Sequence, residues 1–260
     1  MCDRRRVFLS LFLLLFGNCL FAQRPDTPSA PLRIAAAADL QPVLPPILRE
    51  FEQQTGIRAD ASFQSSATLA TQIINGAPFD LFLAADTSFP QRVIDAGRAE
   101  ETHPISYATG TLVLWTRNDS GVASLTPEAL TSDAVHSIAI ASPEHAPYGR
   151  AAQATLQHWH LLDAVRPKLR IAENIAQAAQ YADSGNAQVG FISLTSALTP
   201  RLKADGHFVR LPPEDHPPIL QGAVVVRDAA GGRAARRFLD FLRTSAVART
   251  LAAEGLEPAS

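Results

Sequence analysis

The chain has 260 residues and a formal net charge of −2, with 47% hydrophobic and 18% charged residues. This balance provides no excess of positive charge, so bulk electrostatics favour neither nucleic acid nor anionic lipid as a partner. Both cysteines, Cys2 and Cys19, lie in the first 22 residues. A chain that loses this segment can therefore have no disulfide, no thiolate metal site and no cysteine nucleophile.

The first 22 residues have the pattern of a secretory signal peptide. Three arginines at positions 4–6 precede an apolar run over 7–16, and Ala22 offers a small residue at a cleavage point. The run is shorter than the roughly 20 residues that span a bilayer. We expect cleavage near Ala22 and a periplasmic or otherwise extracytoplasmic protein; a retained anchor, or a lipoprotein anchor at Cys19, is the weaker alternative. Cleavage removes three Arg and one Asp, which changes the net charge to −4.

After a proline-rich segment at 23–31 that is expected to be disordered, strands and helices alternate. Short apolar strands between helices predict an α/β fold with two doubly wound lobes and parallel sheets. Strands are predicted at 32–37, 57–63, 80–84, 110–116, 137–141, 169–172, 189–192, 206–211 and 221–227. Helices are predicted at 42–55, 67–75, 88–96, 127–131, 149–159, 176–184, 233–244 and 246–254.

Two proline-marked segments predict hinge crossings between the lobes. The first, at 104–107, leads into an apolar strand, and the second lies between the prolines at 212–213 and 217–218. We therefore expect lobe I to contain residues 31–107 plus 218–260, and lobe II to contain residues 108–217.

Two turns from a strand into a helix contain small polar residues. The first is at Asp39, after the run Leu32-Arg-Ile-Ala-Ala-Ala-Ala, and the second is at Ser65-Ser66. The first turn of a helix has unpaired N–H groups and the positive end of the helix dipole. Two such turns aimed at one point predict an anion site that needs no Lys or Arg.

Four segments carry a family resemblance: Ser65-Ser-Ala-Thr-Leu-Ala, the stretch 75–86 (Asn-Gly-Ala-Pro-Phe-Asp-Leu-Phe-Leu-Ala-Ala-Asp), 142–149 (Ser-Pro-Glu-His-Ala-Pro-Tyr-Gly) and 185–192 (Gly-Asn-Ala-Gln-Val-Gly-Phe-Ile). Through them, and over nearly its whole mature length, the chain resembles the periplasmic molybdate-binding proteins of ABC transporters. The resemblance implies the bilobed type II periplasmic-binding fold and a tetrahedral oxyanion between the lobes. It implies molybdate or tungstate as the ligand, an ABC transporter membrane permease as the partner, a monomer, no cofactor and no catalysis.

The resemblance also implies five ligand-binding residues, with no direct protein ligand to the metal atom. Ser66 lies on the family's binding serine, and Ile175 matches a small apolar residue that donates its backbone N–H. Tyr148 falls where the family has a backbone or tyrosine contact, and Ser193 where many members have Tyr. Asp39 stands where the family commonly has Ser or Asn.

Asp39 conflicts with a dianionic ligand. A carboxylate about 5 Å from a dianion costs roughly 6 kcal/mol at an effective dielectric constant near 20. Either Asp39 turns away and caps its own helix, or the ligand is not a bare dianion. We favour the first interpretation, with the backbone N–H groups near Asp39 serving the ligand.

The sequence leaves three other functions open. The chain could be a receptor for a different small oxyanion, which the Asp39 departure favours, or a sensor subunit that reports the ligand without transport. It could also be a secreted hydrolase that uses Asp39 with His145, although no convincing nucleophile–base pair and no nucleophile-elbow or phosphate-loop motif is present.

Overall fold

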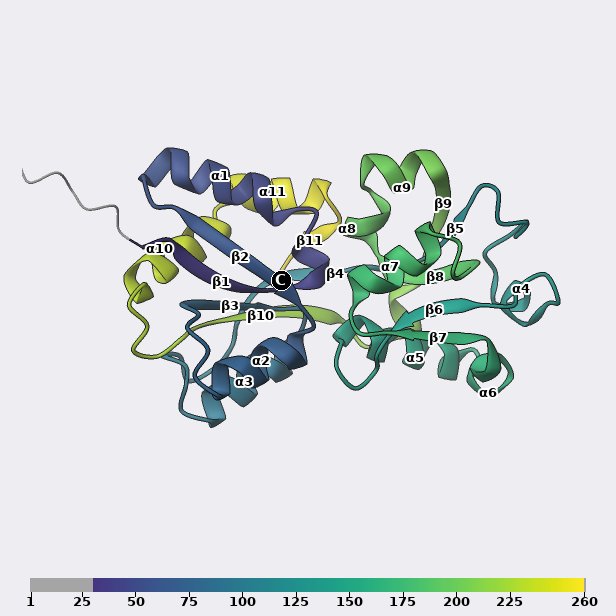
Figure 1. The fold of residues 1–260 in the computed structure, drawn as a ribbon, viewed down its shortest axis with the longest axis horizontal. Coiled ribbons are helices and arrows are strands. Elements are labelled where there is room, and N and C mark those ends of the chain that lie inside the picture. Colours follow the sequence, from purple (N-terminus) through teal and green to yellow (C-terminus); the bar gives the residue numbers. More distant parts are fainter. Residues whose placement is uncertain (1–29, 260) are drawn as a thin grey trace, which may run out of the picture.

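The computed structural model describes residues 30–259, which form two α/β lobes side by side (Figure 1). The predicted signal peptide, its cleavage point and most of segment 23–31 lie outside this range. In residues 30–259, no helix combines the length and apolar character needed to cross a membrane.

Lobe I is formed by both ends of the described chain. Its first part contains β1 (Leu32–Ala37), the 3₁₀ turn η1 (Ala38–Leu40), α1 (Leu44–Thr55), β2 (Ala59–Gln64), α2 (Ser66–Ile74), β3 (Leu81–Ala84), α3 (Ser88–Asp95) and β4 (Ile105–Gly110). The chain later returns with β10 (Ile219–Val225), α10 (Gly232–Leu242), α11 (Ser245–Ala253) and β11 (Leu256–Pro258). The six strands have the order β11-β4-β10-β3-β1-β2.

Lobe II is one continuous segment. It contains β5 (Leu112–Arg117), α4 (Pro127–Thr131), β6 (Ile138–Ala141), α5 (Pro147–His158), α6 (Leu162–Val165), η2 (Arg166–Lys168), β7 (Leu169–Ala172) and α7 (Ile175–Asp183). It continues with β8 (Val189–Ser193), α8 (Leu194–Ala197), α9 (Pro200–Asp205), β9 (Gly206–Arg210) and η3 (Pro213–Asp215). Its five strands have the order β7-β6-β8-β5-β9.

The predicted two-lobed α/β architecture is confirmed, but the sheets are mixed rather than wholly parallel. β1 runs parallel to β2 and β3, whereas β10 is antiparallel to β3 and β4. In lobe II, β6 is parallel to β7 and β8, and β5 is antiparallel to β8 and β9. The antiparallel pairs involve the strands next to the crossings, because the chain returns through the hinge against the direction of the central strands.

The first crossing lies three or four residues later than predicted. Residues 105–107 of the segment interpreted as a connection begin strand β4 of lobe I, and the change of lobe falls at Thr111, between β4 and β5. A polar and small-residue run such as Ser-Tyr-Ala-Thr-Gly does not show strand periodicity clearly. Pairing with β10 and β11 makes it a strand, which is a tertiary effect that local propensity does not predict.

Both faces of the lobe I sheet are buried under helices. Ile34 and Ala36 of β1 face a core with α1, α10 and α11, whereas Ala35 faces a second core with α2 and α3. This alternation follows from the two-residue period of a strand, and Figure 1 shows α1 and α11 on one side of the sheet and α2 and α3 on the other. Lobe II has the same construction, with separate cores on its two faces.

Helix α1 starts at Leu44 and not at Pro42 as predicted. Pro45 and Pro46 then stand in the first turn, where a missing N–H costs no intrahelical hydrogen bond. The helix ends at Thr55, and the following Gly56 has a φ of 72°, in the left-handed region that glycine adopts without strain.

Candidate functional site

A cavity between the lobes is lined by residues from five segments that meet at the ends of parallel strands. It is small, with a volume of about 10 Å³, and is lined by Ala37, Ala38, Asp39, Gln64, Ser65, Ser66, Ala85, Ala146, Pro147, Tyr148, Asn174 and Ile175. β1, β2 and β3 of lobe I end here, as do β6 and β7 of lobe II. Crevices outside the carboxyl ends of strands are the usual ligand sites of open α/β sheets.

Four of the five predicted site residues therefore line one cavity. Asp39 and Ser66 come from lobe I, whereas Tyr148 and Ile175 come from lobe II, more than a hundred positions away from Asp39 in the sequence. All four side chains are buried.

Ser65 and Ser66 have different roles at the start of α2. Ser65 is the N-cap, and its Oγ accepts a hydrogen bond from the backbone N–H of Thr68 at 3.2 Å. The Oγ of Ser66 accepts a bond from the backbone N–H of Ala85 at 3.1 Å. Because the Ala85 N–H fills one lone pair of this oxygen and fixes its position, the hydroxyl proton of Ser66 is available to donate.

Ile175 is the first residue of α7, which Asn174 caps. Asn174 Oδ1 accepts a hydrogen bond from the backbone N–H of Gln177 at 3.0 Å. The N–H of Ile175, like that of Ser66, has no partner within its own helix. The cavity thus receives the N-terminal ends of two helices, each of nine residues, whose dipoles favour an anion.

Asp39 does not cap its own helix, so the favoured prediction for its side chain is wrong. The turn η1 has no side-chain cap, and Asp39 Oδ2 instead accepts hydrogen bonds from the hydroxyl of Tyr148 at 3.1 Å and from Gln221 Nε2. Oδ1 is buried without a hydrogen-bond partner among the described residues. Burial raises the pKa of Asp39 to about 6, and the bonds from Gln221 and Tyr148 oppose this shift.

Tyr107 and Gln221 are part of the site, and sequence analysis missed them. The Tyr107 hydroxyl donates to Gln221 Oε1 at 2.7 Å and is also 3.3 Å from the carbonyl oxygen of Ala84. This contact fixes the Gln221 amide with its Nε2 toward Asp39. The one signal in the sequence was a glutamine at the head of the apolar run 222–226, because a polar residue buried in a strand needs a partner.

Ser193 lies outside the lining of this cavity. It is the N-cap of α8, where its Oγ accepts from the backbone N–H of Ser196 at 3.3 Å and contacts the hydroxyls of Thr195 and Ser196 at 2.9 Å. Its neighbour Thr195 does reach the other lobe, since its Oγ1 donates to the carbonyl oxygen of Asp39 at 2.7 Å.

The hydrolase pair is not assembled. His145 is exposed, and its contact with lobe I runs through its backbone carbonyl, which accepts from the N–H of Ala67 at 3.2 Å. Asp39 is bonded to Tyr148 and Gln221 and not to this histidine. Within residues 30–259, no group of three or more His, Cys, Asp or Glu side chains is placed to hold a metal ion.

Contacts between the lobes surround the cavity. Besides the bonds at Asp39 and Ala67, Arg150 of α5 forms an ion pair with Asp86 after β3, and the Arg150 guanidinium lies 5.2 Å from the ring centre of Phe89. The structure is therefore a closed arrangement in which the two lobes share buried polar contacts.

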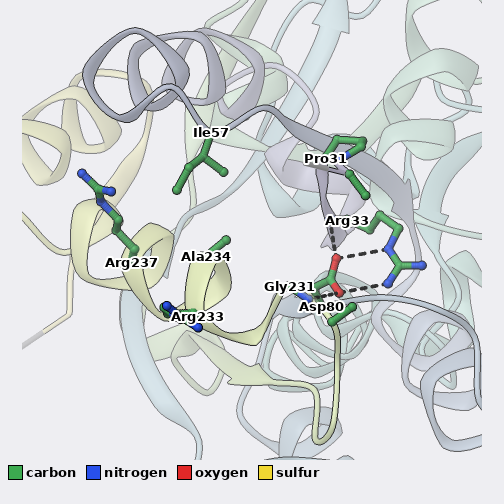
Figure 2. Close-up of a pocket in the computed structure, with 10 residues that line it drawn as sticks. Pro31, Arg33, Ile57, Asp80, Gly231, Arg233, Ala234 and Arg237 are labelled. Atoms are coloured by element: carbon green, nitrogen blue, oxygen red, sulfur yellow. Dashed lines mark hydrogen bonds and ion pairs between the residues drawn. The ribbon is translucent and has the colours of Figure 1, made fainter. Parts of the chain in front are cut away.

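A larger pocket, of about 560 Å³, lies at the opposite end of lobe I, and all of its lining residues belong to lobe I. Its lining includes Arg33, but Figure 2 shows that this guanidinium faces Asp80. Asp80 accepts bonds from Arg33 Nε at 3.1 Å and from the backbone N–H groups of Arg33 and Gly231. This carboxylate anchors the start of β1 to the loop before α10.

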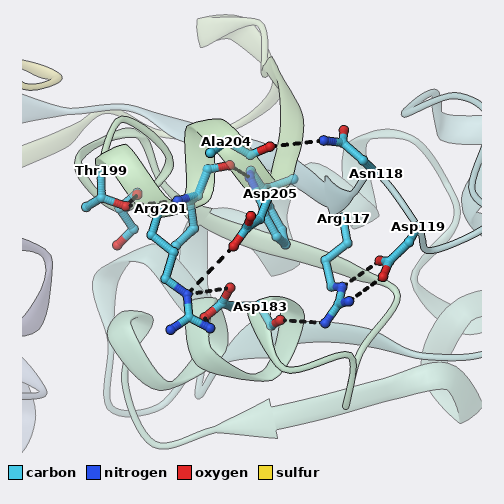
Figure 3. Close-up of polar contacts among 11 residues, drawn as sticks. Arg117, Asn118, Asp119, Asp183, Thr199, Arg201, Ala204 and Asp205 are labelled. Atoms are coloured by element: carbon cyan, nitrogen blue, oxygen red, sulfur yellow. Dashed lines mark hydrogen bonds and ion pairs between the residues drawn. The ribbon is translucent and has the colours of Figure 1, made fainter.

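The polar cluster at the edge of lobe II is also structural (Figure 3). Arg117 pairs with Asp119, and Arg201 bridges Asp183 and Asp205 across α7 and α9. These arginines are partly or largely exposed, and exposed ion pairs contribute about 0–1 kcal/mol each. Each carboxylate in the cluster already has a cationic partner, so the cluster offers no convergent site.

Comparisons with known proteins agree with this geometry. Residues 32–257 match the family model described as bacterial extracellular solute-binding protein. The chain is 37% identical to the molybdate-binding protein ModA of Rhodobacter capsulatus over 75% of each chain. It is 32% identical to ModA of Azotobacter vinelandii over 95% of this chain and 97% of that one.

The solved periplasmic molybdate-binding protein of Azotobacter vinelandii has a TM-score of 0.82 to this chain at 29% identity, and covers 88% of this chain and 100% of its own. The predicted type II periplasmic-binding fold is confirmed by this match. The relatives of this chain are binding proteins for transport and not enzymes. This agrees with the observation that Asp39 and His145 are not bonded to each other. The chain therefore belongs to the bacterial extracellular solute-binding protein family.

Proposed function

We propose that this protein is an extracytoplasmic receptor that captures molybdate between its lobes and delivers it to the membrane permease of an ABC transporter. Tungstate, an oxyanion of the same shape and charge, is the expected second ligand. The protein acts as a monomer, needs no cofactor, contacts no nucleic acid and catalyses no reaction.

One observation carries this proposal. Ser66 Oγ is held by the Ala85 N–H and lines a buried cavity that also receives the N-terminal ends of α2 and α7. The Ser66 hydroxyl and the N–H groups at the starts of α2 and α7 can bind an anion without a positive side chain. The fold of the two lobes fixes their positions. About six charge-assisted hydrogen bonds at roughly 1.5–3 kcal/mol each support micromolar or tighter binding after association costs.

The relatives identify the oxyanion. The two relatives above, at 37% and 32% identity, are molybdate-binding proteins. Closure of the lobes about the crossing at Thr111 and its counterpart before β10 then surrounds the anion, which is the hinge mode of periplasmic binding proteins.

The decisive experiment is isothermal titration calorimetry of residues 23–260 against molybdate, tungstate, sulfate and phosphate. Tight one-to-one binding of molybdate and tungstate, without heat from sulfate, supports the proposal. Binding of sulfate or phosphate in place of molybdate instead identifies a receptor for another oxyanion. Neighbouring genes for a permease and an ATPase separate a transport receptor from a sensor subunit.

A further inference from the structure

Only one of the two oxygens of the Asp39 carboxyl group accepts hydrogen bonds from described residues. Oδ2 accepts hydrogen bonds from Tyr148 and Gln221, whereas Oδ1 is buried and has no partner among the described residues. Asp39 has no exposed surface, and it lines the cavity between the lobes together with Ser66 and Ile175. A buried polar atom without a partner costs free energy and needs an explanation.

The surroundings of Asp39 supply donors but no positive charge. Tyr148 comes from α5, Gln221 from β10 and Tyr107 from β4, and Thr195 of α8 bonds to the Asp39 carbonyl oxygen. Burial raises the pKa of both tyrosines well above the usual value of 10, so they stay protonated. In residues 30–259, no Arg, Lys or His forms an ion pair with Asp39.

An ionised carboxylate in this position has two unfavourable interactions when an oxyanion enters. Its own burial already disfavours the charged form, and it then faces a second negative group with no cation between them. A neutral carboxylic acid has neither problem. Its Oδ2 keeps the two hydrogen bonds from Tyr148 and Gln221, and its Oδ1–H becomes a donor.

We propose that Asp39 binds the oxyanion as a neutral acid, donating its Oδ1–H to one oxygen of the anion, so that ligand capture takes up one proton. This inference rests on the proposed function of the site. No covalent bond to the anion changes: an ionised Asp39, one proton from solvent and the free anion give the complex. The site then selects anions that present an acceptor oxygen at Oδ1.

A defined pH dependence follows. The pKa of Asp39 is about 6 in this closed arrangement, so Asp39 is mostly ionised above pH 7 in the ligand-free protein. Because the complex holds the neutral acid, proton uptake approaches one per ligand above pH 7. The dissociation constant then rises tenfold for each pH unit, or roughly 30-fold between pH 7.0 and 8.5. In this range molybdate carries no proton of its own, so the dependence reports the protein.

The test is calorimetry of the full chain, expressed with its leader and purified from the periplasm, with molybdate as the probe. Titrations at pH 7.5 in buffers with different ionisation enthalpies measure the proton uptake, and a series from pH 7.0 to 8.5 measures the slope. Asp39→Asn keeps an acceptor oxygen for Tyr148 and Gln221 and a permanent N–H donor for the anion. We expect its affinity to be independent of pH and to exceed that of the wild type at pH 8.5. The exposed Asp60→Asn serves as the matched control and keeps the wild-type slope.

Each of the remaining outcomes refutes one specific statement. Molybdate binding without proton uptake in the wild type refutes the neutral-acid role of Asp39 and leaves the receptor function in place. A pH slope that persists in Asp39→Asn assigns the proton to another group and also refutes it. Absence of binding by wild-type protein with a native circular dichroism spectrum refutes the proposed function itself, and with it this inference.

Discussion

Neighbouring serines at the start of α2 have separate roles, because Ser65 caps the helix and Ser66 faces the cavity. We expect Ser66→Ala to weaken molybdate binding by about 1–3 kcal/mol, which is roughly a 5- to 150-fold rise in the dissociation constant, because one hydrogen bond to a charged ligand is lost. Calorimetry measures this change. Ser62→Ala, an exposed serine four residues earlier, is the control and leaves the affinity unchanged. Equal affinity of Ser66→Ala and wild type means that this hydroxyl does not contact the anion.

Ser193 provides the opposite case at the same scale. As the N-cap of α8, outside the cavity lining, it is expected to contribute stability and not affinity. Ser193→Ala should lower the free energy of unfolding by about 1 kcal/mol, measured by urea denaturation, with the molybdate dissociation constant unchanged. A tenfold loss of affinity at unchanged stability would restore the contact that the family resemblance implied for this residue.

Among the helices, α7 couples stability to the site. Its cap, Asn174, lines the cavity and fixes the helix start that positions the N–H of Ile175. We expect Asn174→Ala to reduce both the free energy of unfolding, by about 0.5–2 kcal/mol, and the affinity for the anion. Thr126→Ala removes the equivalent cap from α4, which is remote from the cavity. This control should lose stability alone, and a loss of affinity in both variants would indicate a global effect instead.

For the whole molecule, the buried Asp39 carboxyl links stability to pH. Its pKa in the folded protein, about 6, lies above the ordinary value of 3.8. The stability that the neutral form provides is therefore fully present below pH 3.8 and is lost as pH rises through 6. A shift of this size corresponds to about 3 kcal/mol, an upper bound because opening of the lobes hydrates the carboxylate.

The difference between wild type and Asp39→Asn isolates this effect from other carboxylates, such as Asp80, whose pKa is lowered by hydrogen bonds from Arg33. We expect the ligand-free Asn variant to gain stability relative to wild type between pH 4 and 6.5 and to keep a constant advantage above that. Thermal unfolding monitored by circular dichroism measures the difference. A difference that does not vary with pH would show that Asp39 does not titrate on unfolding.

How much the sequence determined depends on the range of the interactions involved. The alternation of short apolar runs with amphipathic segments predicts the two α/β lobes, because burial of a strand or helix face imposes its own period on the sequence. The small polar turn at Ser66 could be located, since helix starts have local signals such as the cap Ser65, whereas Ile175 was identified through the family resemblance. Only the tertiary structure decided that 105–110 forms a strand and that Ser193 is a cap outside the cavity. It also decided that Asp39 points to Tyr148 and Gln221, which lie 109 and 182 positions along the chain. A carboxylate takes whichever donors the fold brings within reach, and no local pattern encodes a contact across the hinge.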